Sequence, residues 1–121
     1  MKAICFILLV ITIELGCAKF HSVHLINDQS AMLYLRDSEI LHGDYWDPEP
    51  PSHLIGRLDG QTGFSGKVAK LRYGYSNYYI QVKFGEKWDG TPFCDTARYI
   101  LSVSCKYEET EDEVFFTVKI T

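Results

Sequence analysis

The sequence lacks an excess of positive charge. Its 121 residues hold 12 Lys and Arg against 16 Asp and Glu, a formal net charge of −4 at pH 7. Proteins that bind nucleic acid need a basic face to neutralise phosphates, so nucleic acid is not expected as a partner. The same balance argues against attachment to membranes through anionic headgroups alone.

Helical periodicity is missing after the first 18 residues. No window there repeats apolar residues at i, i+3, i+4 and i+7 between capping residues, so no long helix is expected. Short alternating runs recur instead, most clearly at residues 78–84, where Tyr, Ile, Val and Phe alternate with Gln and Lys. Several such runs between turn signals predict an all-β protein, an antiparallel β-sandwich of about seven strands.

Three segments carry more local predictions. Residues 20–27 and 31–36, split by an Asn-Asp-Gln-Ser turn, predict a β-hairpin. Residues 42–53 contain three prolines and are expected to be neither strand nor helix. Residues 59–66 contain three glycines and predict a turn-rich connector.

A hydrophobic run long enough to span a membrane is also lacking. The apolar run from Ala3 to Ile13 follows Lys2 and precedes the small residues Gly16 and Ala18. A span needs about 20 residues, so this layout indicates a secretory signal peptide over residues 1–18. Residues 19–121 then form a single secreted, extracellular domain. The alternative, a lipoprotein acylation site at Cys17, is disfavoured by the nearby Glu14.

Cysteine is scarce once the signal peptide is removed, because only Cys94 and Cys105 remain. In an oxidising compartment an isolated pair most often forms a disulfide, and two free buried thiols are the alternative. Closing so short a loop stabilises a domain by roughly 3 kcal/mol.

Aromatic residues, in contrast, are frequent in the predicted loops. Such rings favour surfaces that are apolar on one side and wet on the other, such as a lipid headgroup layer or a protein interface. We therefore expect a ligand-binding set at one end of the domain, made of Tyr45, Trp46, Tyr75, Tyr79 and Trp88. The alternative is that the rings cap the core, which we favour for Tyr78, in register with Ile80.

Motifs for catalysis or metal binding are weak. His42 and His53, with Glu49 between them, suggest an acid/base pair of a small hydrolase, but no basic phosphate ligands stand out beside them. Gly-Phe-Ser-Gly at 63–66 does not fit the nucleophile elbow Gly-x-Ser-x-Gly. The oxygen-bearing side chains of residues 44, 47 and 49 match no dedicated calcium loop. We expect no enzyme activity, no cofactor and no metal.

Between positions 23 and 93, a set of separated residues follows one another in a characteristic order along the chain. They are Asn27, Leu33, Leu35, His42, Gly43, Pro50, Pro51, Ile55, Thr62, Gly63, Gly66, Tyr73, Ile80, Phe84 and Gly90. This order resembles the aegerolysin and actinoporin-like cytolysin group. The resemblance implies a compact β-sandwich that recognises membrane lipids such as sphingolipids, with candidate headgroup contacts at Tyr73, Tyr75, Tyr78 and Tyr79. Residues 19–23 leave no room for the N-terminal helix with which actinoporins line a pore.

Two functions follow from these observations. The first is a secreted β-sandwich that binds membrane lipid headgroups, as a cytolysin-like toxin or effector. The second is a secreted effector or inhibitor module that binds a partner protein through the same aromatic anchors, since Trp and Tyr dominate binding hot spots.

Overall fold

The computed structural model describes residues 20–121, which form eight β-strands and no helix; this part of the chain therefore contains no helix that could cross a membrane. The all-β prediction is confirmed, with eight strands instead of about seven. The predicted signal peptide and Lys19 lie outside the described residues. The strands are β1 (Phe20–Asn27), β2 (Leu33–Trp46), β3 (His53–Leu54), β4 (Asp59–Tyr75), β5 (Tyr78–Glu86), β6 (Pro92–Tyr99), β7 (Val103–Glu109) and β8 (Glu113–Ile120).

The strands form one continuous, mixed sheet. Its order is β3-β2-β4-β1-β8-β7, and β5 and β6 branch off β4. The β1–β8 pair is parallel and the other pairs are antiparallel, so a strictly antiparallel sandwich is wrong. The predicted hairpin of β1 and β2 is also wrong, because the two strands pair with opposite edges of β4 instead of with each other.

The long strand β4 carries both branches because it bends at Gly66. Residues 59–65 pair with β1 and residues 68–75 with β5, along the same edge. Gly66 has φ +142°, and a Cβ there would lie 2.3 Å from the Cα of Gly43 on β2. Glycine is needed in a strand where two backbones approach this closely. The glycines of residues 59–66 therefore belong to a strand, and the predicted turn-rich connector is wrong.

The proline-containing segment is shorter than predicted. Strand β2 continues to Trp46 and β3 begins at His53, so the loop covers only residues 47–52. A β-bulge between Ile40 and Tyr45 lets β2 follow the bend of β4.

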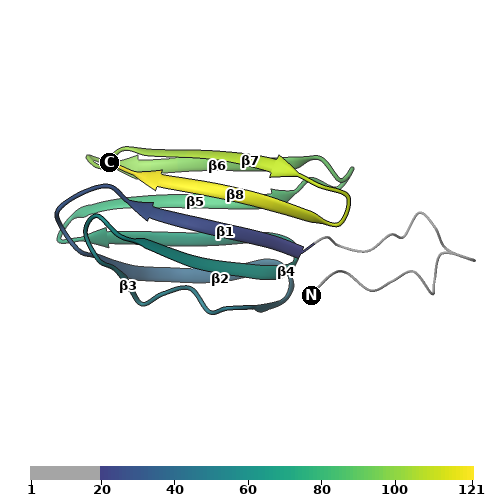
Figure 1. Cartoon of the computed structure of the whole chain (residues 1–121), viewed down its shortest axis with the longest axis horizontal. Coiled ribbons are helices and arrows are strands. Elements are labelled where there is room, and N and C mark those ends of the chain that lie inside the picture. The colour runs from purple at the N-terminus through teal and green to yellow at the C-terminus, as the bar shows by residue number, and fades with distance from the viewer. Residues whose placement is uncertain (1–19) are drawn as a thin grey trace, which may run out of the picture.

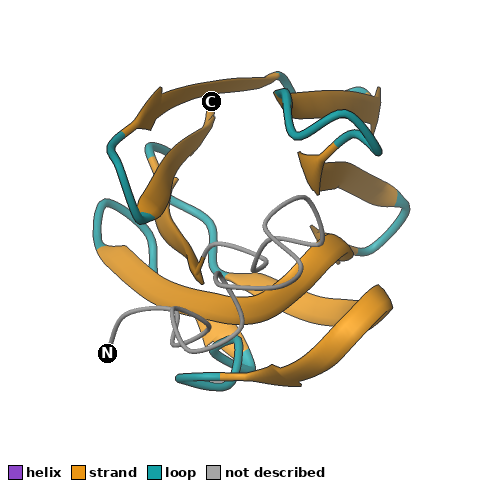
Figure 2. Ribbon diagram, turned by 90° about the vertical axis from the view of Figure 1, so that its right-hand side faces the viewer, coloured by secondary structure: helices purple, strands orange, loops and turns teal. Residues whose placement is uncertain are grey.

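Because β4 folds back, its first and last residues return to the same end of the molecule. Asp59 pairs near the end of β1, and Tyr75 pairs with Tyr78 at the start of β5. We call this the Tyr75 end; it includes the C-terminus, at the left in Figure 1. The opposite, Gly66 end holds the bend, the β5–β6 turn and the β7–β8 turn. Seen along the strands, the sheet curls around a common interior (Figure 2).

The interior is filled by the inward side of the alternating strands. The rings of Phe64 and Phe116 both pack edge-on against Phe84, with centroids 5.6 and 5.2 Å away, and His21 stacks on Phe64 at 4.6 Å. Every second residue is buried along β8 and, on β5, from Ile80 to Phe84, as the period-2 pattern predicts. The predicted disulfide between Cys94 and Cys105 is confirmed and joins β6 to β7.

Candidate functional site

Trp88 is the most exposed large apolar side chain of the described residues, at 91%. It lies at the Gly66 end, in the turn between β5 and β6. Backbone hydrogen bonds from Lys87 N–H to Thr91 O and from Gly90 N–H to Lys87 O, both 2.8 Å, close the turn. Asp89 Oδ1 accepts a further bond from the Thr91 N–H at 3.0 Å. The turn is thus held in shape by its own backbone while the indole faces solvent.

A pocket of about 440 Å³ lies beside this indole. Its walls come from β2, β4, β5, β6 and the turn, and the residues are Leu41, His42, Lys67, Val68, Lys83, Glu86, Lys87, Trp88 and Phe93. We call it the lysine pocket, because three of its side chains are lysines. Its basic chemistry reverses the acidic balance of the whole chain.

The lysines of this pocket were missed in the sequence, although a signal was present. Lys67 lies 16 residues before Lys83 and 20 before Lys87, and none of the three belongs to a motif. The alternating runs at 67–73 and 78–84 flank a turn, and a hairpin register there places Lys83 across from Lys70, so it brings lysines of the two strands to the same region.

Tyr45 and Trp46 lie at the same end but differ in burial. Tyr45 is 53% exposed and pairs with Ser65 on β4. Trp46 is half-buried, and its ring meets the buried ring of Phe64 edge-on at 5.7 Å. Trp46 therefore shares its surface between the core and solvent, while Tyr45 is free to contact a ligand.

The other two predicted site residues, Tyr75 and Tyr79, lie at the opposite, Tyr75 end. Tyr75 packs edge-on against Tyr78 at 5.1 Å, and Tyr79 stacks on Tyr99 at 6.1 Å. The guanidinium of Arg72 sits 4.9 Å above the Tyr79 ring. The five predicted residues are thus not brought together, because the β4–β5 hairpin separates its turn from the β5–β6 turn by a whole strand length.

Tyr73 is fully buried, which corrects its role as a candidate headgroup contact. Its hydroxyl donates a 2.7 Å hydrogen bond to the Pro51 carbonyl. Burial raises the pKa of the phenol far above its ordinary value, so the side chain stays neutral. Tyr73 therefore anchors the 47–52 loop to β4 from inside the core.

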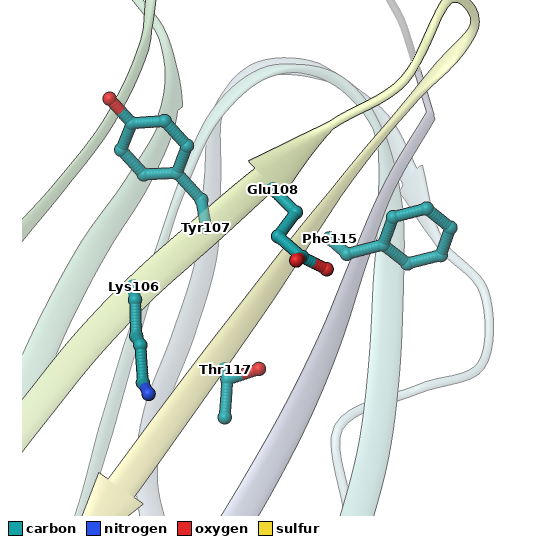
Figure 3. Close-up of a pocket in the computed structure, with 5 residues that line it drawn as sticks. All are labelled: Lys106, Tyr107, Glu108, Phe115 and Thr117. Carbon is teal, nitrogen blue, oxygen red and sulfur yellow. The ribbon is translucent and has the colours of Figure 1, made fainter.

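A second hollow, the β8 trough, lies on the outer face of β1, β8 and β7 (Figure 3). Its two adjoining parts, of about 280 and 440 Å³, share Glu108, Phe115 and Thr117. In Figure 3 Glu108 and Phe115 lie on the same side, and Tyr107 extends away from them. Asp47 and Glu108 line the trough together with Lys106 and His24, so its charges are mixed, whereas the lysine pocket has three lysines and one carboxylate.

The residues weighed for catalysis and metal binding are not assembled. His42 lines the lysine pocket, while His53 pairs with Tyr34 at the Tyr75 end and lies 3.0 Å from the Ser52 hydroxyl through its Nδ1. Asp44, Asp47 and Glu49 are exposed, and within residues 20–121 no three His, Cys, Asp or Glu side chains are grouped as metal ligands.

Comparison with known proteins finds likeness in structure alone. No protein-family model and no curated protein sequence matches the chain. Among solved structures it is similar to the crystal structure of the lipid binding protein Nakanori, with a TM-score of 0.71 over 93% of this chain and 75% of that chain. The two sequences are 9% identical, so the likeness concerns the fold. It supports, at that level, the resemblance drawn from the sequence.

Proposed function

We propose that this protein is a secreted toxin or effector that binds lipid headgroups at a membrane surface with its Gly66 end. The observation that carries the proposal is the exposed indole of Trp88, presented by a hydrogen-bonded turn at the rim of a pocket. Tryptophan partitions to the membrane–water interface because its ring is apolar and its N–H needs a polar partner. The fold likeness to a lipid binding protein adds support.

The lysine pocket favours this function over recognition of a protein. An exposed tryptophan also suits a protein hot spot, so a partner protein is the second candidate. A pocket that combines ammonium groups with Trp88 and Phe93 matches a headgroup layer, which is charged outside and apolar below. Tyr45, 53% exposed at the same end, would add a second ring to the contact.

Co-sedimentation of the secreted protein with vesicles tests the proposal. The vesicles contain phosphatidylcholine alone, or with sphingomyelin, or with phosphatidate. We expect the protein to pellet with at least one mixture, and Trp88→Ala to weaken its binding roughly thirtyfold, as for a hot-spot residue of about 2 kcal/mol. Tyr34→Ala is the matched control, because Tyr34 is 51% exposed at the opposite end. The proposal fails if no mixture pellets the protein, or if both variants bind alike.

A further inference from the structure

Three lysines, Lys67, Lys83 and Lys87, line one pocket of a protein whose net charge is negative, and this needs an explanation. Lys67 follows directly after the Gly66 bend, Lys83 projects outward from β5, and Lys87 opens the β5–β6 turn. Like charges gathered around one hollow repel one another, which costs stability unless a ligand compensates. The chain carries a net charge of −4, so chance alone does not favour such a cluster.

Carboxylates lie near the pocket, but none of them forms a salt bridge within 4.0 Å with Lys67, Lys83 or Lys87 among the described residues. Glu86 lines the pocket but is buried, and its Oε1 lies 3.8 Å from Nε2 of the core residue His21. Hydrogen bonds from Thr91, and then the charge of Lys87, lower the pKa of the Asp89 carboxyl, so this carboxylate offsets part of the Lys87 charge while its Oδ1 accepts the Thr91 N–H. Asp95 is paired in register with Lys83 across β5 and β6, yet these two side chains are not in ion-pair contact.

Lys70, just outside the pocket, shows what a compensated lysine looks like in this protein. Its Nζ lies 3.3 Å from Glu39 and 3.4 Å from Asp37. Side-chain hydrogen bonds to Glu39 and then Asp37 raise the pKa of Lys70. Within residues 20–121, neither Lys67, Lys83 nor Lys87 makes an ion pair of this kind.

We infer that the lysine pocket binds a phosphate group with net negative charge. Lysine ammonium groups are point-charge ligands of phosphate, and several of them can surround one phosphate. The same groups repel a quaternary ammonium, so a choline cation does not fit here. Trp88 and Phe93 give the pocket an apolar wall on which the glycerol part of a lipid can lie. In its lipid form the inference rests on the proposed function, and names an anionic phosphate headgroup as its ligand.

Charge-matched variants separate the pocket from general electrostatics. The double variant Lys83→Gln/Lys87→Gln removes two charges from the pocket, and Lys106→Gln/Lys119→Gln removes two from exposed positions on β7 and β8. We expect the pocket variant to bind phosphatidate-containing vesicles at least roughly tenfold more weakly, as for lost hydrogen bonds to a charged group. The control should bind nearly as the wild type does. An equal loss in both variants would overturn the inference.

Two further experiments distinguish a lipid headgroup from a free phosphate as the ligand of the pocket. Binding titrations with inorganic phosphate and with glycerol phosphate, without vesicles, are read from chemical shifts of the pocket residues. Weak saturable shifts that vanish in Lys83→Gln/Lys87→Gln support the pocket whichever source supplies the phosphate. Equal binding to phosphatidylcholine and phosphatidate vesicles would keep the proposed function and overturn the inference. If the protein binds phosphate saturably but binds no vesicles, the phosphate pocket is kept and the proposed lipid-binding function is overturned. If it binds neither phosphate nor vesicles, the pocket and the proposed function are both overturned.

Discussion

The two ends of the molecule carry aromatic rings in very different environments. At the Tyr75 end Tyr75 packs on Tyr78, and Tyr79 lies between Tyr99 and the Arg72 guanidinium. At the Gly66 end Trp88 is almost fully exposed and, within residues 20–121, stacks on no other ring. Rings that pack on one another stabilise the hairpin, whereas the exposed ring of Trp88 beside a charged pocket is the reason we propose the Gly66 end as the contact surface.

The division between the ends depends on the bend at Gly66. In Gly66→Ala the new Cβ would lie 2.3 Å from Gly43 Cα and 2.6 Å from the His42 carbonyl, at φ +142°. The atoms that must move are backbone, so we expect a loss of roughly 4 kcal/mol or more in the free energy of unfolding. Denaturant titration measures it.

Gly90→Ala is the matched control for that substitution. Gly90 has φ +90° but no atom within 4 Å of its Cβ position, so only conformational strain remains, about 1 to 2 kcal/mol. Equal losses in the two variants would show that the close approach of β2 and β4 is not what requires glycine at position 66.

The disulfide joins the two branches of the sheet at their outer strands. Replacing both Cys94 and Cys105 with Ala opens a loop with a sequence separation of 11 residues, and we expect the free energy of unfolding to fall by roughly 3 kcal/mol. Thermal unfolding of the variant and of the wild type, with and without reductant, gives the comparison. The prediction is contradicted if the melting temperature of the wild type is the same with and without reductant and equals that of the variant.

The tyrosines of the Tyr75 end should matter for stability and not for lipid binding. Tyr79→Ala removes the stack on Tyr99 and the Arg72 contact, at a cost of about 1 to 2 kcal/mol in the free energy of unfolding. Vesicle affinity should stay unchanged. A variant of wild-type stability with weakened binding would reverse the roles of the two ends.

Tyr73, in the core between the ends, should make stability fall at high pH. Burial raises the pKa of its phenol above the unfolded value of about 10.0, so the unfolded chain ionises first. The stabilisation is full below that pH and decreases as the pH rises above it. Tyr73→Phe should lose about 1 kcal/mol at neutral pH, from the bond to Pro51 O, and show a flatter decline above pH 10. Identical slopes would contradict this.

Local patterns in the sequence were sufficient for strands with a regular alternation. Residues 78–84 predicted β5 and its buried side because each side chain follows from the period of the strand. The first arm of β4 was missed, since glycines that permit close approach look the same as turn glycines in a sequence. The parallel pairing of β1 and β8 joins segments from opposite ends of the described chain, and no local signal encodes it.

The candidate site was predicted in part for the same reason. The exposure of Trp88 follows from its place among Lys, Asp and Gly in a turn, and the sequence indicates it. Whether the Tyr79 ring is exposed or packed depends on Tyr99 and Arg72. These two residues reach the ring only because β4, β5 and β6 pair side by side. Net charge concealed the lysine pocket, because charge summed over a chain says nothing about where the charges gather.

The most direct test of the account is the fluorescence of Trp88 in a Trp46→Phe background, where it is the only tryptophan. We predict that vesicles which pellet the protein shift its emission to shorter wavelength, and that brominated lipid chains quench it, because the indole moves from water into the headgroup layer. An unchanged emission while the protein is vesicle-bound would mean that another surface makes the contact, and would contradict the assignment of the Gly66 end.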